Sequence, residues 1–333
     1  MTEDRIKLGH GSGGALSHEL IEKTLLSYFD SPRLSGLADS ASVPTETGRI
    51  AFTTDSHVVD PIFFPGGDIG RLAVCGTVND LAVVGARPRF ISCALLLEEG
   101  FPCSDLERVL SSMRETAAEC EVEVVTGDTK VLPRGKADRI FINTAGIGSL
   151  PRERNLPDGQ MVAGDVLVVS GPLGDHGAAV LSEREGLGME AEVESDCGPV
   201  IGVAEKILAN SRRCSFMRDL TRGGLATILN EAVEDRDVGI TIQEKEIPVR
   251  PAVRALCELL GLDPLYLACE GRVVATVDEQ SAGAVLEALK ACPGGSQSRR
   301  IGTLNAEHAG KVVIETPFGT HRLLQMLSGE QLP

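Results

Sequence analysis

The chain has 333 residues, 42% of them hydrophobic, and a net charge of −16 at pH 7. This length and apolar content can bury a substantial core, so we expect a folded protein with two domains. The excess of acidic residues repels phosphate backbones and anionic lipid. It therefore argues against nucleic acid or membrane as the main partner.

The cysteines and the N-terminus both indicate a cytoplasmic protein. Nine cysteines are an odd number with no Cys-x-x-Cys pair, and most lie in apolar segments. We expect them to be buried and free rather than disulfide-linked or zinc-bound. Residues 1–5 lack the basic and apolar parts of a signal peptide, and no later stretch is long and apolar enough to span a bilayer.

The first part of the chain predicts an N-terminal loop and helix over 1–35 and a mixed α/β domain over 36–155. Apolar side chains at helical spacing indicate an amphipathic helix over 16–29. Apolar periodicity then predicts strands at 50–54, 89–97, 122–126 and 139–147, and helices at 69–84 and 104–120.

Residues 151–159 are rich in charge and turn formers and are the expected linker to a second domain over 156–333. The same periodicity predicts strands in this domain at 165–170, 238–242, 272–277 and 311–315. It predicts helices at 175–185, 198–210, 222–234, 251–260 and 280–291.

Four short segments together predict a site for magnesium and a nucleotide: HGSGG at 10–14, TTDS at 53–56, NDLA at 79–82 and TGDTK at 126–130. Magnesium prefers a few carboxylate oxygens, which Asp55, Asp80 and Asp128 could supply. Glycines let the backbone approach phosphate, and Lys130 offers a point charge. Each segment alone is more typical of a turn or helix cap than of a ligand site, and none matches a Walker A or Gly-x-Gly-x-x-Gly pattern.

Two glycine-bearing turns precede predicted helices in the second domain, at 174–177 and 219–224. The second turn opens a helix whose N-terminus could hold an anion, and Arg222 could bind phosphate or a carboxamide oxygen. An ion pair with Asp219 is the alternative for Arg222. Asp175 and His176 could equally cap a helix.

The order of these segments closely resembles the HypE family of nickel-iron hydrogenase maturation proteins, in the PurM-like (aminoimidazole ribotide synthetase-like) ATP-binding superfamily. The resemblance runs nearly end to end and rests also on DPIFFPGG at 60–67, CGTVND at 75–80, INTAG at 142–146 and EG at 270–271. It implies a two-domain α/β PurM-like fold. The N-terminal sheet would form a β-barrel across a homodimer, with ATP in a groove of that domain.

The resemblance also implies an activity: ATP-dependent dehydration of a carboxamide, carried on a C-terminal cysteine, to a thiocyanate that supplies the cyanide ligands of the hydrogenase iron. HypF would donate the carbamoyl group, and a HypC-HypD complex would accept the cyanide. Family members typically finish Pro-Arg-Ile-Cys, whereas this sequence stops at Pro333. We expect residues to follow Pro333, because a chain that ended there could not carry the substrate in cis.

Site residues follow by the same resemblance. Glu270 matches the general base, with an exposed Glu at a turn as the alternative. Lys130 would steady the phosphate or the imidate oxygen, with a solvated loop lysine as the alternative, and Arg222 completes the catalytic set. Asn79 would be an auxiliary magnesium ligand or an orienting group. The expected metal ligands are Asp55, Asp80 and Asp128, and the expected nucleotide contacts are His10, Gly11, Ser12, Gly13, Gly14, Asp55, Asn79, Asp80, Thr126, Gly127, Asp128, Asp175, Asp219, Thr221, Gly223 and Gly224.

Two other functions fit parts of the pattern. Another kinase or synthetase of the superfamily, such as selenophosphate synthetase or thiamine phosphate kinase, would also need magnesium and ATP. Selenophosphate synthetases usually carry Cys or selenocysteine in the N-terminal glycine loop, and residues 9–14 have neither. A non-catalytic scaffold that binds ATP to present its tail to maturation partners is the third possibility.

Overall fold

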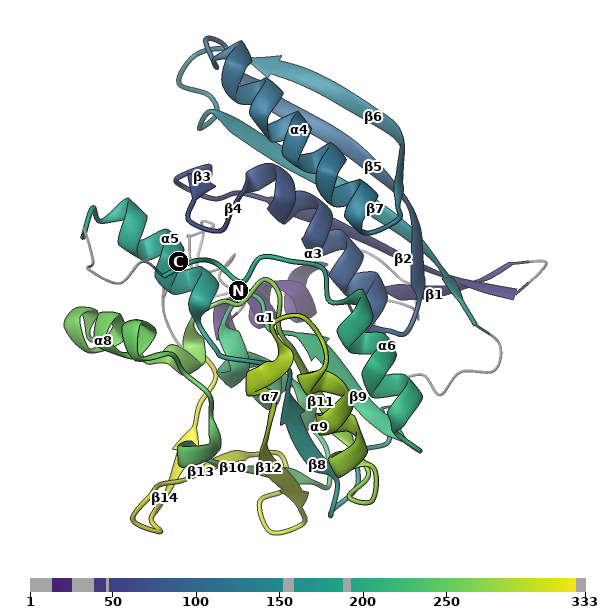
Figure 1. Ribbon diagram of the computed structural model, residues 1–333, viewed down its shortest axis with the longest axis vertical. Coiled ribbons are helices and arrows are strands. Elements are labelled where there is room, and N and C mark those ends of the chain that lie inside the picture. The colour runs from purple at the N-terminus through teal and green to yellow at the C-terminus, as the bar shows by residue number, and fades with distance from the viewer. Residues whose placement is uncertain (1–13, 26–38, 46–47, 152–158, 188–192, 328–333) are drawn as a thin grey trace.

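The computed structural model describes residues 14–25, 39–45, 48–151, 159–187 and 193–327. Two separate sheets, each packed against helices, form its two halves (Figure 1). The predicted α/β class with two domains is therefore confirmed. None of the described helices is long and apolar enough to cross a membrane.

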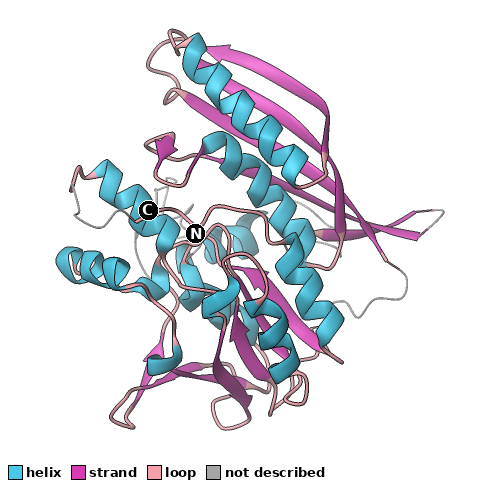
Figure 2. Ribbon diagram, viewed as in Figure 1, coloured by secondary structure: helices cyan, strands magenta, loops and turns pink. Residues whose placement is uncertain are grey.

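The first sheet has five strands in the order β1-β2-β7-β5-β6, of which only β5 and β6 run parallel. Buried and exposed side chains alternate along β2 and β7, so one face of this sheet packs on helices and the other is open (Figure 2). The elements of this half are α1 (Ala15–Leu20), η2 (Ile21–Leu25), β1 (Ala41–Thr45), β2 (Gly48–His57), β3 (Phe63–Phe64), β4 (Gly67–Asp68), α3 (Ile69–Val83), β5 (Arg87–Glu98), α4 (Cys103–Glu119), β6 (Glu123–Leu132) and β7 (Ile140–Leu150).

The second sheet has seven strands in the order β14-β13-β10-β12-β8-β11-β9. Its central strands β8 and β11 are buried at every position, because helices and apolar clusters cover both faces. The elements of this half are β8 (Val166–Val169), α5 (Asp175–Arg184), α6 (Ile201–Asn210), β9 (Cys214–Asp219), α7 (Gly224–Val233), β10 (Gly239–Gln243), η3 (Glu244–Glu246), α8 (Pro251–Leu260), η4 (Pro264–Tyr266), β11 (Val273–Val277), α9 (Ala282–Lys290), η5 (Gly295–Gln297), β12 (Arg299–Asn305), β13 (Val312–Glu315) and β14 (His321–Leu324).

Helix α3 joins the two halves. The Asp68 carboxylate caps its N-terminus by accepting hydrogen bonds from the backbone N–H of Gly70, at 2.7 Å, and of Arg71, at 3.1 Å. One side of the helix packs on β2 and β7, and another contacts α6 and β9 of the second half. Its C-terminal turns, which carry Asn79 and Asp80, therefore lie where the two halves meet.

Every predicted strand and helix is present, although some bounds differ. The predicted helix at 16–29 begins as α1 and continues as the π-helix η2, and its residues 26–29 lie outside the described residues, as do 152–158 of the expected linker. Strands β1, β9, β12 and β14 and the short pair β3–β4 were not predicted. Asp80 lies in α3, as the predicted helix at 69–84 requires, whereas Asp55 and Asp128, which follow predicted strands, lie within β2 and β6.

Candidate functional site

Three carboxylates from distant parts of the chain meet at the junction of the two halves. Asp39 precedes β1, Asp80 lies near the end of α3, and Asp219 is the last residue of β9. One carboxylate oxygen from each lies within 4.8 Å of the others. Thr53 Oγ1 in β2 donates a hydrogen bond to Asp80 Oδ2 at 2.8 Å and so fixes that carboxylate.

The negative charge of this acidic cluster (Asp39, Asp80 and Asp219) is not fully balanced by nearby positive charge among the described residues. Burial raises the pKa of Asp219 to about 8, with the charge of Asp39 as the next cause, and burial raises the pKa of Asp39 to about 6. The pKa of Asp80 is also raised well above its usual value, by burial and then by Asp219. Arg218 Nη1 donates to Asp39 Oδ1 at 2.7 Å, yet the buried Asp39 Oδ2 has no hydrogen-bond partner among the described residues. Close oxygen ligands with an unpaired acceptor fit a hard divalent cation.

Asp55 borders the cluster on the face of β2 that packs on α3. His57 Nε2 lies 3.6 Å from Asp55 Oδ2, and burial lowers the pKa of this histidine, so it is neutral near pH 7. Gly76 on α3 makes room for both side chains, because a Cβ there would lie 2.8 Å from His57 Cε1 and 3.0 Å from Asp55 Oδ2. The charge of Asp55 adds to the raised pKa of Asp80 and of Asp219.

Glu270 faces the same junction from the turn before β11. It is half-buried, and burial raises its pKa well above the usual value; the charges of Asp219 and Asp55 add to the shift, and Arg222 opposes it. Its surroundings therefore exclude the alternative of a freely solvated turn residue. A carboxyl group with a raised pKa beside other carboxylates is typical of proton-transfer sites.

The Asn79 side chain connects α3 to the segments of the second half around Glu270. Its Nδ2 donates to the carbonyl oxygens of Gly198, at 3.1 Å, and of Glu270, at 3.2 Å. Its Oδ1 accepts from the backbone N–H of Val200 at 2.8 Å. Both ends of the amide are used by the protein, which supports the orienting role over the role of metal ligand.

The turn before α7 brings Arg222 and two glycines to this junction. Gly223 and Gly224 have φ of 80° and 60°, and a Cβ on Gly223 would lie 2.2 Å from Thr227 Oγ1. The Arg222 side chain is exposed, and its charge lowers the pKa of both His57 and Glu270. A cation that lies two residues before the ten-residue helix α7 therefore acts on Glu270. Thr221, which precedes Arg222, is half-buried in the same turn.

Asp128 and Lys130 do not join the acidic cluster within one chain. Both side chains are exposed on the edge strand β6, along with Thr126 and Gly127, and Lys130 Nζ lies 3.3 Å from Asp128 Oδ2. Across the sheet, Asp128 on β6 pairs with Ala94 on β5, and Ala94 pairs with Asn143 on β7. Asn143 in turn pairs with Ser56 on β2, the neighbour of Asp55. Paired residues share a face, so Asp128 lies on the open face, opposite to the side chain of Asp55. The predicted ligand set of Asp55, Asp80 and Asp128 is thus not assembled in one chain, and the part of Asp128 stays a prediction.

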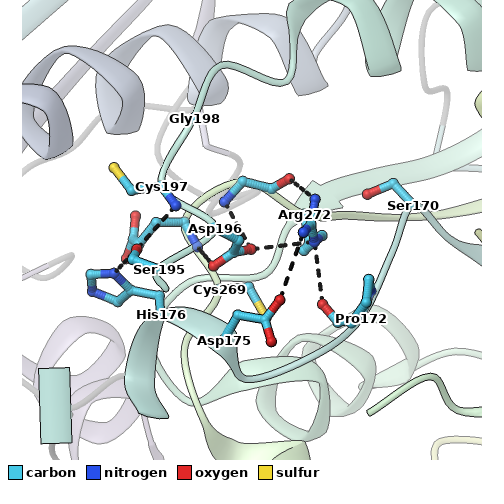
Figure 3. A network of polar contacts seen from close by, with 12 residues as sticks. Ser170, Pro172, Asp175, His176, Ser195, Asp196, Cys197, Gly198, Cys269 and Arg272 are labelled. Atoms are coloured by element: carbon cyan, nitrogen blue, oxygen red, sulfur yellow. Dashed lines mark hydrogen bonds and ion pairs between the residues drawn. The ribbon is translucent and has the colours of Figure 1, made fainter. Parts of the chain in front are cut away.

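Asp175 lies in a different environment, a network of buried charges (Figure 3). It is the first residue of α5, whose N-cap is Gly174 with no side-chain cap hydrogen bond, so the alternative that Asp175 caps this helix is not supported. Its carboxylate lies 3.2 Å from Arg250 Nε and 3.8 Å from Arg272 Nη2, and burial raises its pKa to about 6. His176 Nδ1 lies 2.8 Å from Ser195 Oγ, and burial lowers its pKa to about 4. The predicted contact of Asp175 with the nucleotide has no support in these ion pairs.

The glycine loop is described only at its end. His10, Gly11, Ser12 and Gly13 lie outside the described residues, and so does the segment beyond Leu327. A Cβ on Gly14 would lie 2.4 Å from the carbonyl oxygen of Leu327, which also accepts from the backbone N–H of Ala15 at 3.1 Å. The end of the glycine loop therefore contacts the C-terminal segment.

Sequence patterns did not identify Asp39 or His57, and they gave Asp219 as a nucleotide contact or an ion-pair partner of Arg222 but not as a metal ligand. Asp39 lies in no motif, and only the fold brings it to Asp219, 180 positions further along. His57 did carry a signal, because it follows Asp55 at the two-residue spacing that puts both side chains on one face of a strand.

Comparison with known proteins gives consistent matches along the chain. The profile of the AIR synthase related protein N-terminal domain matches residues 38–150, and that of the C-terminal domain matches residues 162–315. A protein of Rhodobacter capsulatus named carbamoyl dehydratase HypE is 46% identical over 335 residues, which cover 100% of this chain and 98% of that protein.

Solved structures of HypE proteins match the fold of this chain as well as its sequence. The structure of hydrogenase maturation protein HypE in complex with ATP has a TM-score of 0.82 and 48% identity, and the match covers 99% of each chain. The structure of a HypE-HypF complex has a TM-score of 0.86 and 42% identity, covering 92% of this chain and 99% of that chain. The chain therefore belongs to the AIR synthase related proteins and, among them, to the HypE family of hydrogenase maturation proteins.

Proposed function

We propose that this chain is an ATP-dependent carbamoyl dehydratase. It converts a carboxamide carried on a cysteine sulfur into a thiocyanate, the source of the cyanide ligands of the nickel-iron hydrogenase iron. The observation that carries this proposal is the position of Glu270, a carboxyl group with a raised pKa, beside the acidic cluster. Full-length relatives named carbamoyl dehydratase support it.

The acidic cluster fits magnesium, because each of its three carboxylates offers an oxygen ligand. Asp39, Asp80 and Asp219 would hold the ion, and Asp55 lies beside them. When bound, magnesium supplies positive charge to the phosphate oxygens of ATP. Arg222 and the N-terminus of α7 would bind further phosphate oxygens, because N–H donors and a guanidinium both favour an anion there.

The reaction needs a leaving group and a base. An amide oxygen leaves poorly as hydroxide, so the γ-phosphoryl group of ATP is transferred to it and ADP departs. The nitrogen loses one proton as the phosphorylated imidate forms, and it loses the second as phosphate leaves and the carbon–nitrogen triple bond forms. Glu270 would accept the second of these protons, because a carboxylate with a raised pKa is a better base than a solvated one.

The open face of the first sheet supports a homodimer. Phe52 on β2 pairs with Ile147 on β7, which pairs with Phe90 on β5, and these side chains are 44%, 38% and 44% exposed. An apolar row beside an unpaired edge strand favours burial against a second copy. Asp128 and Lys130 project from this same face, so we propose that they reach the site of the paired copy.

Light scattering tests the homodimer. At micromolar concentration we expect a mass twice the 35.2 kDa of one chain. The variant Phe52→Asp/Ile147→Lys places two charges in the apolar row and should give monomers, because removing charged side chains from water costs more than their mutual attraction returns. Leu259→Asp, on the exposed face of α8, is the matched control and should stay dimeric. A monomeric wild-type chain would contradict the dimer and the β-barrel that it implies.

The partners follow from the family. The solved HypE-HypF complex supports HypF as carbamoyl donor. We further propose that a HypC-HypD complex accepts the cyanide and that these steps take place in the cytoplasm. The domain bounds 36–155 and 156–333 also remain a proposal.

The test of the function is product analysis. The chain is extended by Arg-Ile-Cys after Pro333, carbamoylated on the added thiol, and incubated with magnesium and ATP. We expect a mass loss of one water at that cysteine with one ADP released per thiocyanate. A chain extended by Arg-Ile-Ser is the control and should give neither. ADP release without thiocyanate would instead indicate a kinase, and ATP binding without turnover would indicate a scaffold.

A further inference from the structure

The turn that carries Glu270 borders open space on one side. A cleft of about 730 Å³ lies behind it, lined by Asp196, Gly198, Gly271 and Arg272 among others. Because solvent fills a cleft of this size, packing alone does not fix the position of the turn on that side. Polar contacts must therefore hold its backbone.

Asp196 makes those contacts. The backbone N–H of Glu270 donates to Asp196 Oδ1 at 3.2 Å, and the N–H of Gly271 donates to Asp196 Oδ2 at 3.3 Å (Figure 3). The carboxylate is only 1% exposed. Hydrogen bonds to a buried charged acceptor are stronger than neutral ones, so this pair defines the backbone of the turn.

The chain around Asp196 also fits closely against the turn. A Cβ on Gly271 would lie 1.9 Å from the carbonyl oxygen of Asp196, so no side chain can be accommodated there. The N–H of Gly198 donates to the carbonyl oxygen of Glu270 at 3.3 Å. Segment 196–198 and the turn thus contact each other along their backbones.

Arg272 supplies the opposite charge. Its Nε lies 3.5 Å from Asp196 Oδ2 and donates to the carbonyl oxygen of Pro172 at 3.2 Å. Burial raises the pKa of Asp196, and Arg272 and the two N–H donors oppose that shift. The arginine therefore helps to keep this acceptor charged in a buried position.

We propose that Asp196 is a positioning residue that holds the Glu270 carboxyl in its reactive place by fixing the backbone of residues 270–271. The inference rests on the proposed role of Glu270 as the base. A base that moves by about 1 Å can lose on the order of 100-fold in rate, so the effect belongs to turnover rather than to ATP binding.

The experiment compares kcat and the KM for ATP of the carbamoylated chain with those of Asp196→Asn. Asparagine keeps the shape but turns one acceptor oxygen into a donor, so one N–H of the turn loses its partner. We expect kcat to fall about 10- to 100-fold and the KM for ATP to stay within about twofold. Ser195→Ala is the matched control: its hydroxyl contacts His176 and the N–H of Cys197 but not the turn, and kcat should stay near wild type.

Each other outcome overturns the inference. An unchanged kcat, a loss confined to KM, or an equal loss in Ser195→Ala would show that Asp196 does not act through the base. If Asp196→Asn does not fold, Asp196→Glu keeps the charge but moves both acceptor oxygens away from the N–H groups of the turn, and it should show the same loss in kcat. Glu270→Gln is measured in parallel. Wild-type turnover by Glu270→Gln would show that Glu270 is not the base. Loss of turnover in Glu270→Gln together with full turnover in Asp196→Asn would overturn only the positioning role of Asp196.

Discussion

Glu270→Gln is expected to bind magnesium and ATP with nearly wild-type affinity and yet to form thiocyanate about 10² to 10⁴ times more slowly. Glutamine has nearly the same size and fits the same turn, but it cannot accept the proton that must leave the nitrogen. The loss should therefore appear in kcat and leave the KM for ATP almost unchanged.

The measurement is single-turnover mass analysis of the carbamoylated chain, with ATP affinity from calorimetry. Glu258→Gln on the exposed side of α8 is the matched control, because it makes the same change away from the junction and should be fully active. Thiocyanate formed by Glu270→Gln at the wild-type rate would remove Glu270 from the mechanism. A large loss of ATP affinity would assign it to nucleotide binding instead.

Much of the fold was predictable because its strongest patterns are local. Strands β8 and β11, apolar at every position except Thr276, are buried on both faces, and a short apolar run between turn signals indicates such a strand. The missed strands lack that signal. β12 begins Arg299-Arg300 and is exposed there, and β1 contains Pro44 and lies at a sheet edge, where the sheet tolerates a proline.

The chemistry of the site was predictable from the sequence, but the set of residues that form it was only partly predictable. The sequence indicated acidic residues for a metal, a glycine-rich turn before α7 and Glu270, and Asp80, Asp219, Arg222 and Glu270 do meet. It could not show which carboxylates share a cluster, because that depends on strand faces and on the approach of two halves. Asp55 and Asp128 lie on opposite faces of one sheet, whereas Asp39 is brought to Asp219 by long-range packing.

Asp80→Asn should reduce magnesium-dependent ATP binding by at least about 100-fold, which corresponds to about 2.7 kcal/mol. Asparagine can still accept the hydrogen bond from Thr53 but removes one of three close negative charges. Calorimetry with ATP, with and without magnesium, measures the loss. In the absence of metal the variant should be at least as stable as wild type, because the substitution relieves repulsion among buried carboxylates, and a thermal melt checks this.

Two companion variants decide which carboxylates form the metal site. Asp219→Asn should lose magnesium-dependent binding as strongly as Asp80→Asn, because both side chains belong to the acidic cluster. Asp128→Asn lies on the open face, so it should affect binding only where a second copy supplies its carboxylate; in the monomeric Phe52→Asp/Ile147→Lys background it should change nothing further. Normal binding by Asp219→Asn would refute the cluster as the metal site. A loss caused by Asp128→Asn in the monomer would place that carboxylate in the site of its own chain, against the strand register that separates it from Asp55.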